Sequence, residues 1–231
     1  MTARLLRGVF VAGTDTGVGK TVVSAALLYR LRAMHGGVRY WKPIQTGIDE
    51  DDDTATVRWL TGGDSSAVLD QGVRLKPPVS PHLAARQAGV SIGIDDLVGV
   101  VAAQSSHRRW IVEGAGGVLV PVNDRERMVD LMARLGLPAV VVARCTLGTI
   151  NHTLLTLEAL RARSIAVAGV VMVGDPSPDN REAIERYGAV SVLGTLPILN
   201  PLSPTALQQA ASALSDLAVL EAHFVQEDAT A

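Results

Sequence analysis

Residues 13–21 read Gly-Thr-Asp-Thr-Gly-Val-Gly-Lys-Thr, between the apolar run 9–12 and the helix-like run 22–28. The order strand, glycine-rich turn, Lys-Thr and helix is typical of a loop that holds a nucleoside triphosphate, because backbone N–H groups and the helix N-terminus surround the phosphate oxygens. In such loops the lysine reaches the outer phosphates and the threonine hydroxyl binds Mg²⁺. We therefore expect nucleotide contacts from Gly13, Thr14, Asp15, Gly17, Val18, Gly19, Lys20 and Thr21.

One position of this loop departs from the usual pattern. The residue six positions before the lysine is Thr14 rather than glycine, and the upstream glycine is Gly13. The alternative interpretation is a glycine turn that opens an ordinary helix. Gly-Lys-Thr placed between a strand and a helix argues against that alternative.

Composition narrows the class of protein. The chain has 231 residues, of which 48% are hydrophobic and 3% aromatic, so aliphatic side chains must fill the core. A net charge of −2 argues against a nucleic-acid partner. The single cysteine, Cys145, fits a reducing cytoplasm. No apolar run approaches the ~20 residues that cross a bilayer, so we expect no membrane association.

Apolar runs alternate with segments of helical period along the whole chain. Continuous valine-rich runs such as 139–143 and 167–171 are typical of parallel strands covered on both faces. We expect a mostly parallel central sheet flanked by helices on both faces, in one α/β P-loop domain over 1–231 with a disordered tail at 226–231. The expected strands are 8–12, 37–41, 109–113, 138–144, 166–173 and 190–196. The expected helices are 20–34, 54–61, 81–88, 95–105, 127–135, 151–163, 179–187 and 204–221.

Polar segments follow four of the expected strands. They are the glycine-rich loop, the segment 42–47 with the acidic run 49–53 after it, the segment 113–117, and the segment 146–152. The carboxyl ends of parallel strands share one edge of a sheet, and ligands bind there. Segments far apart in the chain should therefore meet in one cleft.

Several residues of these segments suit phosphate chemistry. Glu113 can bind a Mg²⁺ that phosphates and Thr21 already hold, and the small residues 114–117, Gly116 among them, permit close backbone approach. A solvated strand end is the alternative for Glu113. Lys42 is a second lysine that can face the phosphates, or it is a surface lysine. In the acidic run, spacing does not single out a metal ligand, and Asp53 also suits a helix N-cap.

Five motifs in this order resemble the dethiobiotin synthetase family over most of the chain to about residue 197. They are Gly-Thr-Asp-Thr-Gly-Val-Gly-Lys-Thr (13–21), Lys-Pro-Ile-Gln-Thr-Gly (42–47), Ser-Pro-His (80–82), Val-Glu-Gly-Ala-Gly-Gly (112–117) and Gly-Thr-Ile-Asn-His (148–152). The resemblance implies an ATP- and Mg²⁺-dependent reaction. CO₂ adds to an amine of 7,8-diaminononanoate (diaminopelargonate), the carbamate takes the γ-phosphoryl group, and the second amine closes the cyclic urea with release of phosphate.

The resemblance also assigns roles to residues. It implies that Lys20 and Lys42 hold the γ-phosphate and carbamate, and that Thr16 lies beside the reacting group. It selects Asp53, with Thr21 and Glu113, for Mg²⁺. Substrate contacts fall to Thr46, Ser80, Leu147 and Asn151, the last two from the partner subunit of a homodimer whose active site lies at the interface. From the residues alone, Asn151 is equally a helix cap.

Two departures from the family pattern concern the nucleotide. Gly17 replaces an acidic residue found in some members, and the stretch 172–176 lacks the asparagine that reads adenine in many members. We therefore expect a looser base preference than that of a relative with the asparagine.

Two other classes of protein are alternatives. A ParA/MinD-like ATPase switch carries a lysine five positions before the loop lysine, where this chain has Asp15, and the chain has no basic amphipathic tail. A cobyrinate-amidase-like synthase needs a further glutamine-hydrolysing domain, for which 231 residues leave no room.

Overall fold

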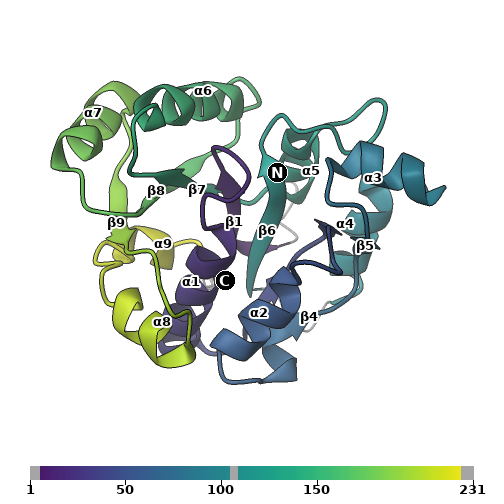
Figure 1. Ribbon diagram of the computed structural model, residues 1–231, viewed down its shortest axis with the longest axis horizontal. Helices are drawn as coiled ribbons and strands as arrows, with labels where there is room; N and C mark the ends of the chain where they lie inside the picture. Colours follow the sequence, from purple (N-terminus) through teal and green to yellow (C-terminus); the bar gives the residue numbers. More distant parts are fainter. Residues whose placement is uncertain (1–5, 105–108, 225–231) are drawn as a thin grey trace, which may run out of the picture.

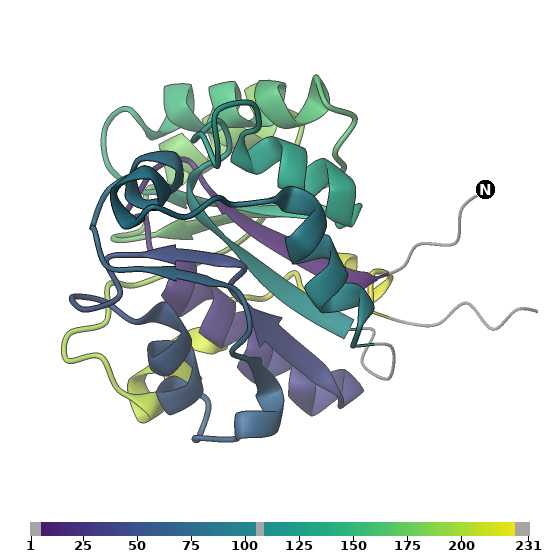
Figure 2. The same cartoon turned by 90° about the vertical axis from the view of Figure 1, so that its right-hand side faces the viewer.

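A computed structural model describes residues 6–104 and 109–224 (Figures 1 and 2). Seven strands form one parallel sheet in the order β4-β2-β6-β1-β7-β8-β9. Their bounds are β4 (Val68–Leu69), β2 (Val38–Trp41), β6 (Arg109–Gly117), β1 (Arg7–Gly13), β7 (Ala139–Arg144), β8 (Val167–Val173) and β9 (Val192–Leu196).

Helices cover both faces of this sheet (Figure 1). One face packs against α1 (Lys20–His35), α2 (Asp53–Leu60), α8 (Pro204–Ala211) and α9 (Ala218–Glu221). The other packs against α3 (Pro81–Ala88), α4 (Ile94–Ala102), α5 (Met128–Leu135), α6 (Thr149–Arg161) and α7 (Pro178–Gly188). The predicted α/β class, with a parallel sheet between helices, is confirmed.

The central strand β1 shows why the apolar runs are continuous. Val9 and Val11 belong to one buried cluster, whereas Phe10 and Ala12 belong to the cluster on the opposite face. Successive side chains of a strand point to opposite faces, so a strand covered on both sides is apolar at every position.

Four short elements were not predicted from the sequence. They are β4, the 3-10 turn Ser65–Ala67, and a separate two-stranded parallel sheet of β3 (Ile44–Thr46) and β5 (Val73–Leu75). Two or three residues are too few to show a period. The third predicted strand is instead longer than expected, because β6 continues to Gly117, which pairs with Gly13 of β1.

The predicted helix 204–221 is wrong, because the segment forms two helices, α8 and α9. Between them Leu214 bridges to Gly194 of β9. A Cβ atom at Gly194 would lie 2.3 Å from the Ala213 carbonyl oxygen, so only glycine allows this close approach. The backbone contact with the sheet interrupts the helix.

Within residues 6–104 and 109–224, no helix combines the length and apolar character needed to span a bilayer. The predicted tail 226–231, and the end of the predicted helix 95–105, lie outside the described residues.

Candidate nucleotide-binding and catalytic site

The glycine-rich loop joins β1 to α1, as expected from the sequence. Gly17 and Gly19 adopt φ angles of 67° and 96°, which favour glycine. A Cβ atom at Gly13 would lie 2.7 Å from the Asp15 carbonyl oxygen and 2.9 Å from Lys20 Nζ. The usual motif has a glycine at the position of Thr14. In this protein the close approach to Lys20 and to the Asp15 backbone occurs at Gly13 instead, so position 14 accepts a threonine.

The loop lysine is folded back against its own loop. Lys20 Nζ donates to the Asp15 carbonyl oxygen at 3.0 Å and is 6% exposed. Burial, followed by the charge of Lys42, lowers the pKa of Lys20 to about 8. Phosphate oxygens beside Lys20 would favour its charged form.

A cavity of about 370 Å³ opens beside this loop. It brings together residues from β1–α1, from the segment after β2, from α2 and from β6. Its lining includes ten of the predicted site residues: Thr16, Gly17, Gly19, Lys20, Thr21, Lys42, Thr46, Asp53, Glu113 and Gly116. Three of the four predicted polar segments therefore converge on this cleft, whereas no residue of the fourth segment, 146–152, lines it.

Glu113 lies at the centre of the polar contacts in this cavity, although it is fully buried within β6 rather than at a strand end. One carboxylate oxygen accepts from Lys42 Nζ at 2.7 Å and from the Thr21 hydroxyl at 3.2 Å. The other accepts from the Tyr40 hydroxyl at 3.0 Å. The solvated strand end that was the alternative for Glu113 is wrong.

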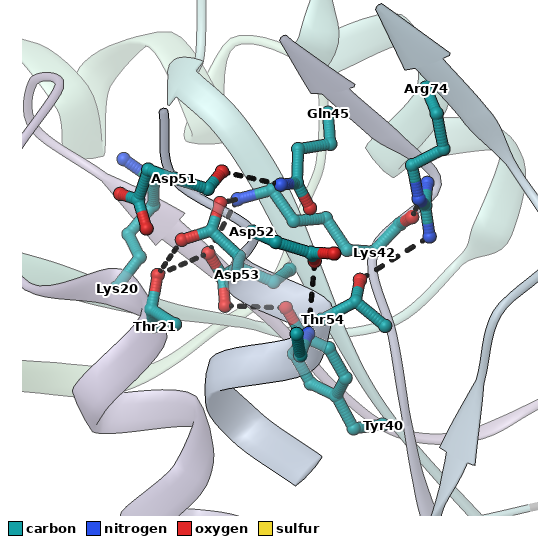
Figure 3. Close-up of polar contacts among 12 residues, drawn as sticks. Lys20, Thr21, Tyr40, Lys42, Gln45, Asp51, Asp52, Asp53, Thr54 and Arg74 are labelled. Carbon is teal, nitrogen blue, oxygen red and sulfur yellow. Dashed lines mark hydrogen bonds and ion pairs between the residues drawn. The ribbon is translucent and has the colours of Figure 1, made fainter. Parts of the chain in front are cut away.

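Asp53 completes the same network (Figure 3). Its carboxylate accepts from the Thr21 hydroxyl and forms an ion pair with Lys42. It occupies the first position of α2, whereas Asp52 caps that helix by accepting from the Ala55 N–H at 2.9 Å. The possible N-cap role of Asp53 is therefore wrong, and its side chain is left to face the cavity.

Burial and charge act in opposite directions on Lys42, which is 4% exposed. Burial lowers its pKa, but the carboxylates of Glu113 and Asp53 outweigh burial, so that the net pKa is raised and Lys42 is charged. Burial, and next the charge of Glu113, raise the pKa of Tyr40 well above its ordinary value. Tyr40 is therefore a neutral hydroxyl that donates to Glu113. The alternative of a surface lysine at position 42 is wrong.

The donor set of this network suits Mg²⁺. Thr21, Asp53 and Glu113 present one hydroxyl and two carboxylates, and the Thr21 hydroxyl lies within hydrogen-bond distance of both carboxylates. The described part of the chain holds no group of three or more His, Cys, Asp or Glu residues arranged for a metal. Mg²⁺ with a nucleotide does not need such a group, because it takes few protein ligands and fills its shell with phosphate oxygens and water.

The remaining predicted residues lie elsewhere. Ser80, at the start of α3, contacts His82 Nδ1 through its hydroxyl at 3.0 Å. Leu147 is fully exposed, and Asn151 is exposed inside α6. Gly148 is the N-cap residue of α6, so the alternative role of Asn151 as a cap is wrong.

A second hollow of about 430 Å³ adjoins the loop on the side of α6. Thr16 lines both cavities. The other lining residues are Thr14, Asp15, Gly117, Val118, Leu119, Val120, Pro121, His152, Leu155, Thr156 and Ala159. The glycine-rich loop thus separates the cavity that contains Lys20 and Glu113 from a second hollow beside α6.

Sequence reasoning missed four residues around the site. Tyr40 holds Glu113, and Arg144 donates to the Thr16 carbonyl oxygen at 2.8 Å. Gln45 donates a hydrogen bond to the Asp51 carbonyl oxygen, and Arg74 donates one to the Lys42 carbonyl oxygen. The sequence did carry a signal for two of them. Tyr40 places a hydroxyl within an apolar run, and Arg144 ends one.

The fold and the loop around Lys20 define a P-loop nucleotide-binding protein. The family model described as an AAA domain matches residues 7–206. The chain is 47% identical to the ATP-dependent dethiobiotin synthetase BioD of Agrobacterium fabrum over 200 residues, which cover 87% of this chain and 90% of that protein. It is 51% identical to the enzyme of the same name from Paramagnetospirillum magneticum over 191 residues, 83% and 88% of the two chains. The chain belongs to the dethiobiotin synthetase family, as its motifs predicted.

Solved structures show the same fold at low identity. A ParA family ATPase from Chlorobium tepidum superposes with a TM-score of 0.58 at 10% identity, covering 96% of this chain and 97% of that one. The cell division ATPase MinD of Pyrococcus furiosus gives 0.55 at 17% identity, covering 95% and 99%. These likenesses concern the fold alone.

Proposed function

We propose that this protein is an ATP-dependent ligase that converts 7,8-diaminononanoate and CO₂ to dethiobiotin, with release of ADP and phosphate. The observation that carries the proposal is the convergence of Lys20, Lys42, Thr21, Asp53 and Glu113 on one cavity. Membership of the dethiobiotin synthetase family supplies the substrates. We place the protein in the cytoplasm, where ATP is available for a biosynthetic reaction of this kind.

The residues of the cavity suit phosphoryl transfer to a carbamate. Such transfer depends on position and on positive charge more than on a covalent nucleophile. Lys20 and Lys42 are two buried ammonium groups that stabilise negative charge on the transferred phosphoryl group and carbamate. The substrate amines act as nucleophiles, and Thr16 lies beside the reacting group between the two cavities.

Thr21, Asp53 and Glu113 would hold Mg²⁺ with the nucleotide. The bound ion supplies positive charge to the phosphate oxygens. Tyr40 orients Glu113 by its hydrogen bond, and Thr21 contacts both carboxylates. These contacts hold the three candidate ligands together.

We further propose a homodimer whose active site lies at the interface. Leu147 is fully exposed beside the start of α6, and Leu119 and Leu155 are 51% and 56% exposed. In this arrangement Thr46 and Ser80 contact the diamine, and Leu147 and Asn151 of the partner subunit approach its carboxylate. Leu119 and Leu155, which are exposed and line the second hollow, support the assignment.

The ParA/MinD-like switch is not favoured by any side chain of the site. Its supporting observation is a fold likeness at 10–17% identity. Asp15, at the position of the switch lysine, accepts from the Thr16 N–H at 2.7 Å and pairs with Arg144 at 3.4 Å. The carboxylate is thus engaged within its own loop.

Purified protein with Mg-ATP and bicarbonate is expected to release ADP only when the diamine is added. The physical reason is that the amines supply the carbamate that accepts the phosphoryl group. ADP release is measured in a coupled assay with and without 7,8-diaminononanoate, and dethiobiotin is identified by mass spectrometry. Diamine-independent ATP hydrolysis without dethiobiotin would contradict the proposed function.

We expect ATP to outcompete CTP and GTP by less than a hundredfold (about 2.7 kcal/mol). The stretch after β8 has Gly174 and Asp175 rather than asparagine. The nearby Asn180 amide donates to the Cys145 carbonyl oxygen at 3.0 Å, so that this N–H is committed within the protein. Competition of each nucleotide against a fluorescent ATP analogue measures the preference. A larger ATP advantage would end this prediction.

A further inference from the structure

The acidic run 49–53 folds into a turn whose last three residues perform different tasks. The N–H groups of Glu50 and Asp51 donate to the Gly47 carbonyl oxygen at 2.9 and 3.0 Å. Asp52 caps α2, and Asp53 faces Thr21 and Lys42. The placement of Asp53 in the cavity therefore depends on how this turn is held.

Charge repulsion works against that placement. Five consecutive acidic residues lie beside a cavity that already contains the buried carboxylate of Glu113. Like charges held together favour an outward movement of the turn. The ion pair of Asp53 with Lys42 opposes this movement, and a further tie to the protein body adds to that effect.

Gln45 makes such a tie (Figure 3). Gln45 as a whole residue is 1% exposed, and its Nε2 atom donates to the Asp51 carbonyl oxygen at 2.7 Å. Gln45 belongs to β3, where its backbone is opposite Arg74 of β5. The bond therefore connects the turn to a strand that begins two residues after Lys42.

The chemistry of the amide suits this task. A neutral N–H bonded to a backbone carbonyl leaves the carboxylates free for a cation, whereas a lysine or arginine would compete for them. Gln45 Oε1 has no hydrogen-bond partner within the part of the chain that the structure describes. An unpaired buried oxygen lowers stability, so an apolar side chain of the same length would suit folding better than glutamine does.

We propose that Gln45 is a positioning residue that holds Asp53 in the divalent-cation site by fixing the Asp51 carbonyl. The inference rests on the proposed function, because it takes Asp53 as a ligand of the cation. Arg74 supports the same geometry from the other side. It donates to the Lys42 carbonyl oxygen at 2.9 Å and to the Thr54 hydroxyl at 3.3 Å.

The test measures binding of Mn²⁺ to the protein–ADP complex by electron paramagnetic resonance of the free ion. Gln45→Met keeps the length of the side chain and removes its N–H donors. We expect it to weaken Mn²⁺ binding by about tenfold, the lower end of the effect of removing a residue that orients a metal ligand. Gln45→Glu keeps the shape and sets a carboxylate against the Asp51 carbonyl, so we expect a larger loss.

Two measurements separate positioning from folding. ADP binding in excess EDTA is expected to stay within about twofold of wild type for both variants, since the bond acts on a metal ligand. Urea unfolding is expected to show Gln45→Met with a midpoint close to that of wild type, because loss of the hydrogen bond to Asp51 and removal of the unpaired oxygen act in opposite directions. Gln87→Met is the matched control, an exposed glutamine of α3.

The outcomes distinguish this inference from the proposed function. Wild-type protein that binds no Mn²⁺ with ADP, or an Asp53→Asn variant that binds it equally well, overturns this inference together with the proposed cation site, whereas diamine-dependent ADP release tests the proposed function separately. Asp53-dependent binding that Gln45→Met leaves unchanged overturns this inference alone. A Gln45→Glu variant that binds Mn²⁺ as tightly as wild type would also overturn this inference alone, because the N–H donor of Gln45 would then be dispensable.

Discussion

Replacing Lys42 with methionine is expected to lower kcat by about 10³-fold, the scale of a cation that stabilises the transferred phosphoryl group. ATP affinity should fall by less than about tenfold, because the charge that Lys42 meets develops during the reaction. Pre-steady-state turnover and equilibrium ATP binding measure the two quantities separately. Equal losses in both would show that Lys42 only binds ground-state phosphate.

This substitution also affects folding, so the prediction includes stability. Lys42 is the cation between Asp53 and Glu113. Removing one partner of a buried ion pair costs about 3–5 kcal/mol, and urea unfolding should show a loss on this scale. Turnover is therefore calculated per folded molecule, and Lys42→Arg, which keeps the charge, provides a second variant.

The matched control is Lys76→Met. Lys76 has a side chain that is 80% exposed and pairs with the exposed Asp49 at 3.4 Å. Exposed ion pairs contribute little to the stability of a protein, and Lys76 lies outside the cavity, so turnover and ATP binding should stay within about twofold of wild type. A comparable loss in the control would attribute the effect to lysine removal in general.

Glu113→Gln is expected to raise the Mg²⁺ concentration for half-maximal activity at least tenfold and to lower kcat by about 10²-fold, since one carboxylate of a small ligand set is lost. The amide keeps the shape of the side chain and can still accept from Tyr40. Asp53 continues to pair with Lys42. Titration of activity with Mg²⁺ at saturating ATP gives both numbers.

The control for this prediction is Glu182→Gln on α7, an exposed position. It should leave the Mg²⁺ titration unchanged. Glu113→Gln with the wild-type Mg²⁺ dependence and kcat would remove Glu113 from the metal site. Its contacts with Tyr40, Thr21 and Lys42 would then be structural.

The local parts of the site could be predicted from the sequence because their residues are adjacent in the chain. A strand, a turn and a helix N-terminus form one unit, so Gly13 and Lys20 indicated the phosphate loop directly. Strand direction extended the prediction to Lys42 and Glu113, since parallel strands end at one edge. The family resemblance then selected Asp53 from the acidic run, which spacing did not.

The parts that could not be predicted depend on short elements and on distant contacts. β3 and β5 have three residues each and become visible only as a pair. From the sequence, Gln45 was therefore only one residue of the 42–47 motif, and nothing indicated that its amide donates to the Asp51 carbonyl oxygen. Leu214 read as part of a helix because nothing in its own segment indicates a bridge to Gly194.

The sequence alone determined the class of fold, the phosphate loop and the rim on which the polar segments meet. Periodicity, glycine placement and strand order are properties of the chain itself, and they act over a few residues. Only the tertiary structure decided which groups touch: that Lys42 lies between two carboxylates, that Asp52 rather than Asp53 caps α2, and that Gln45 ties the acidic turn. Those contacts join separate segments, and their geometry depends on the register and packing of the whole sheet.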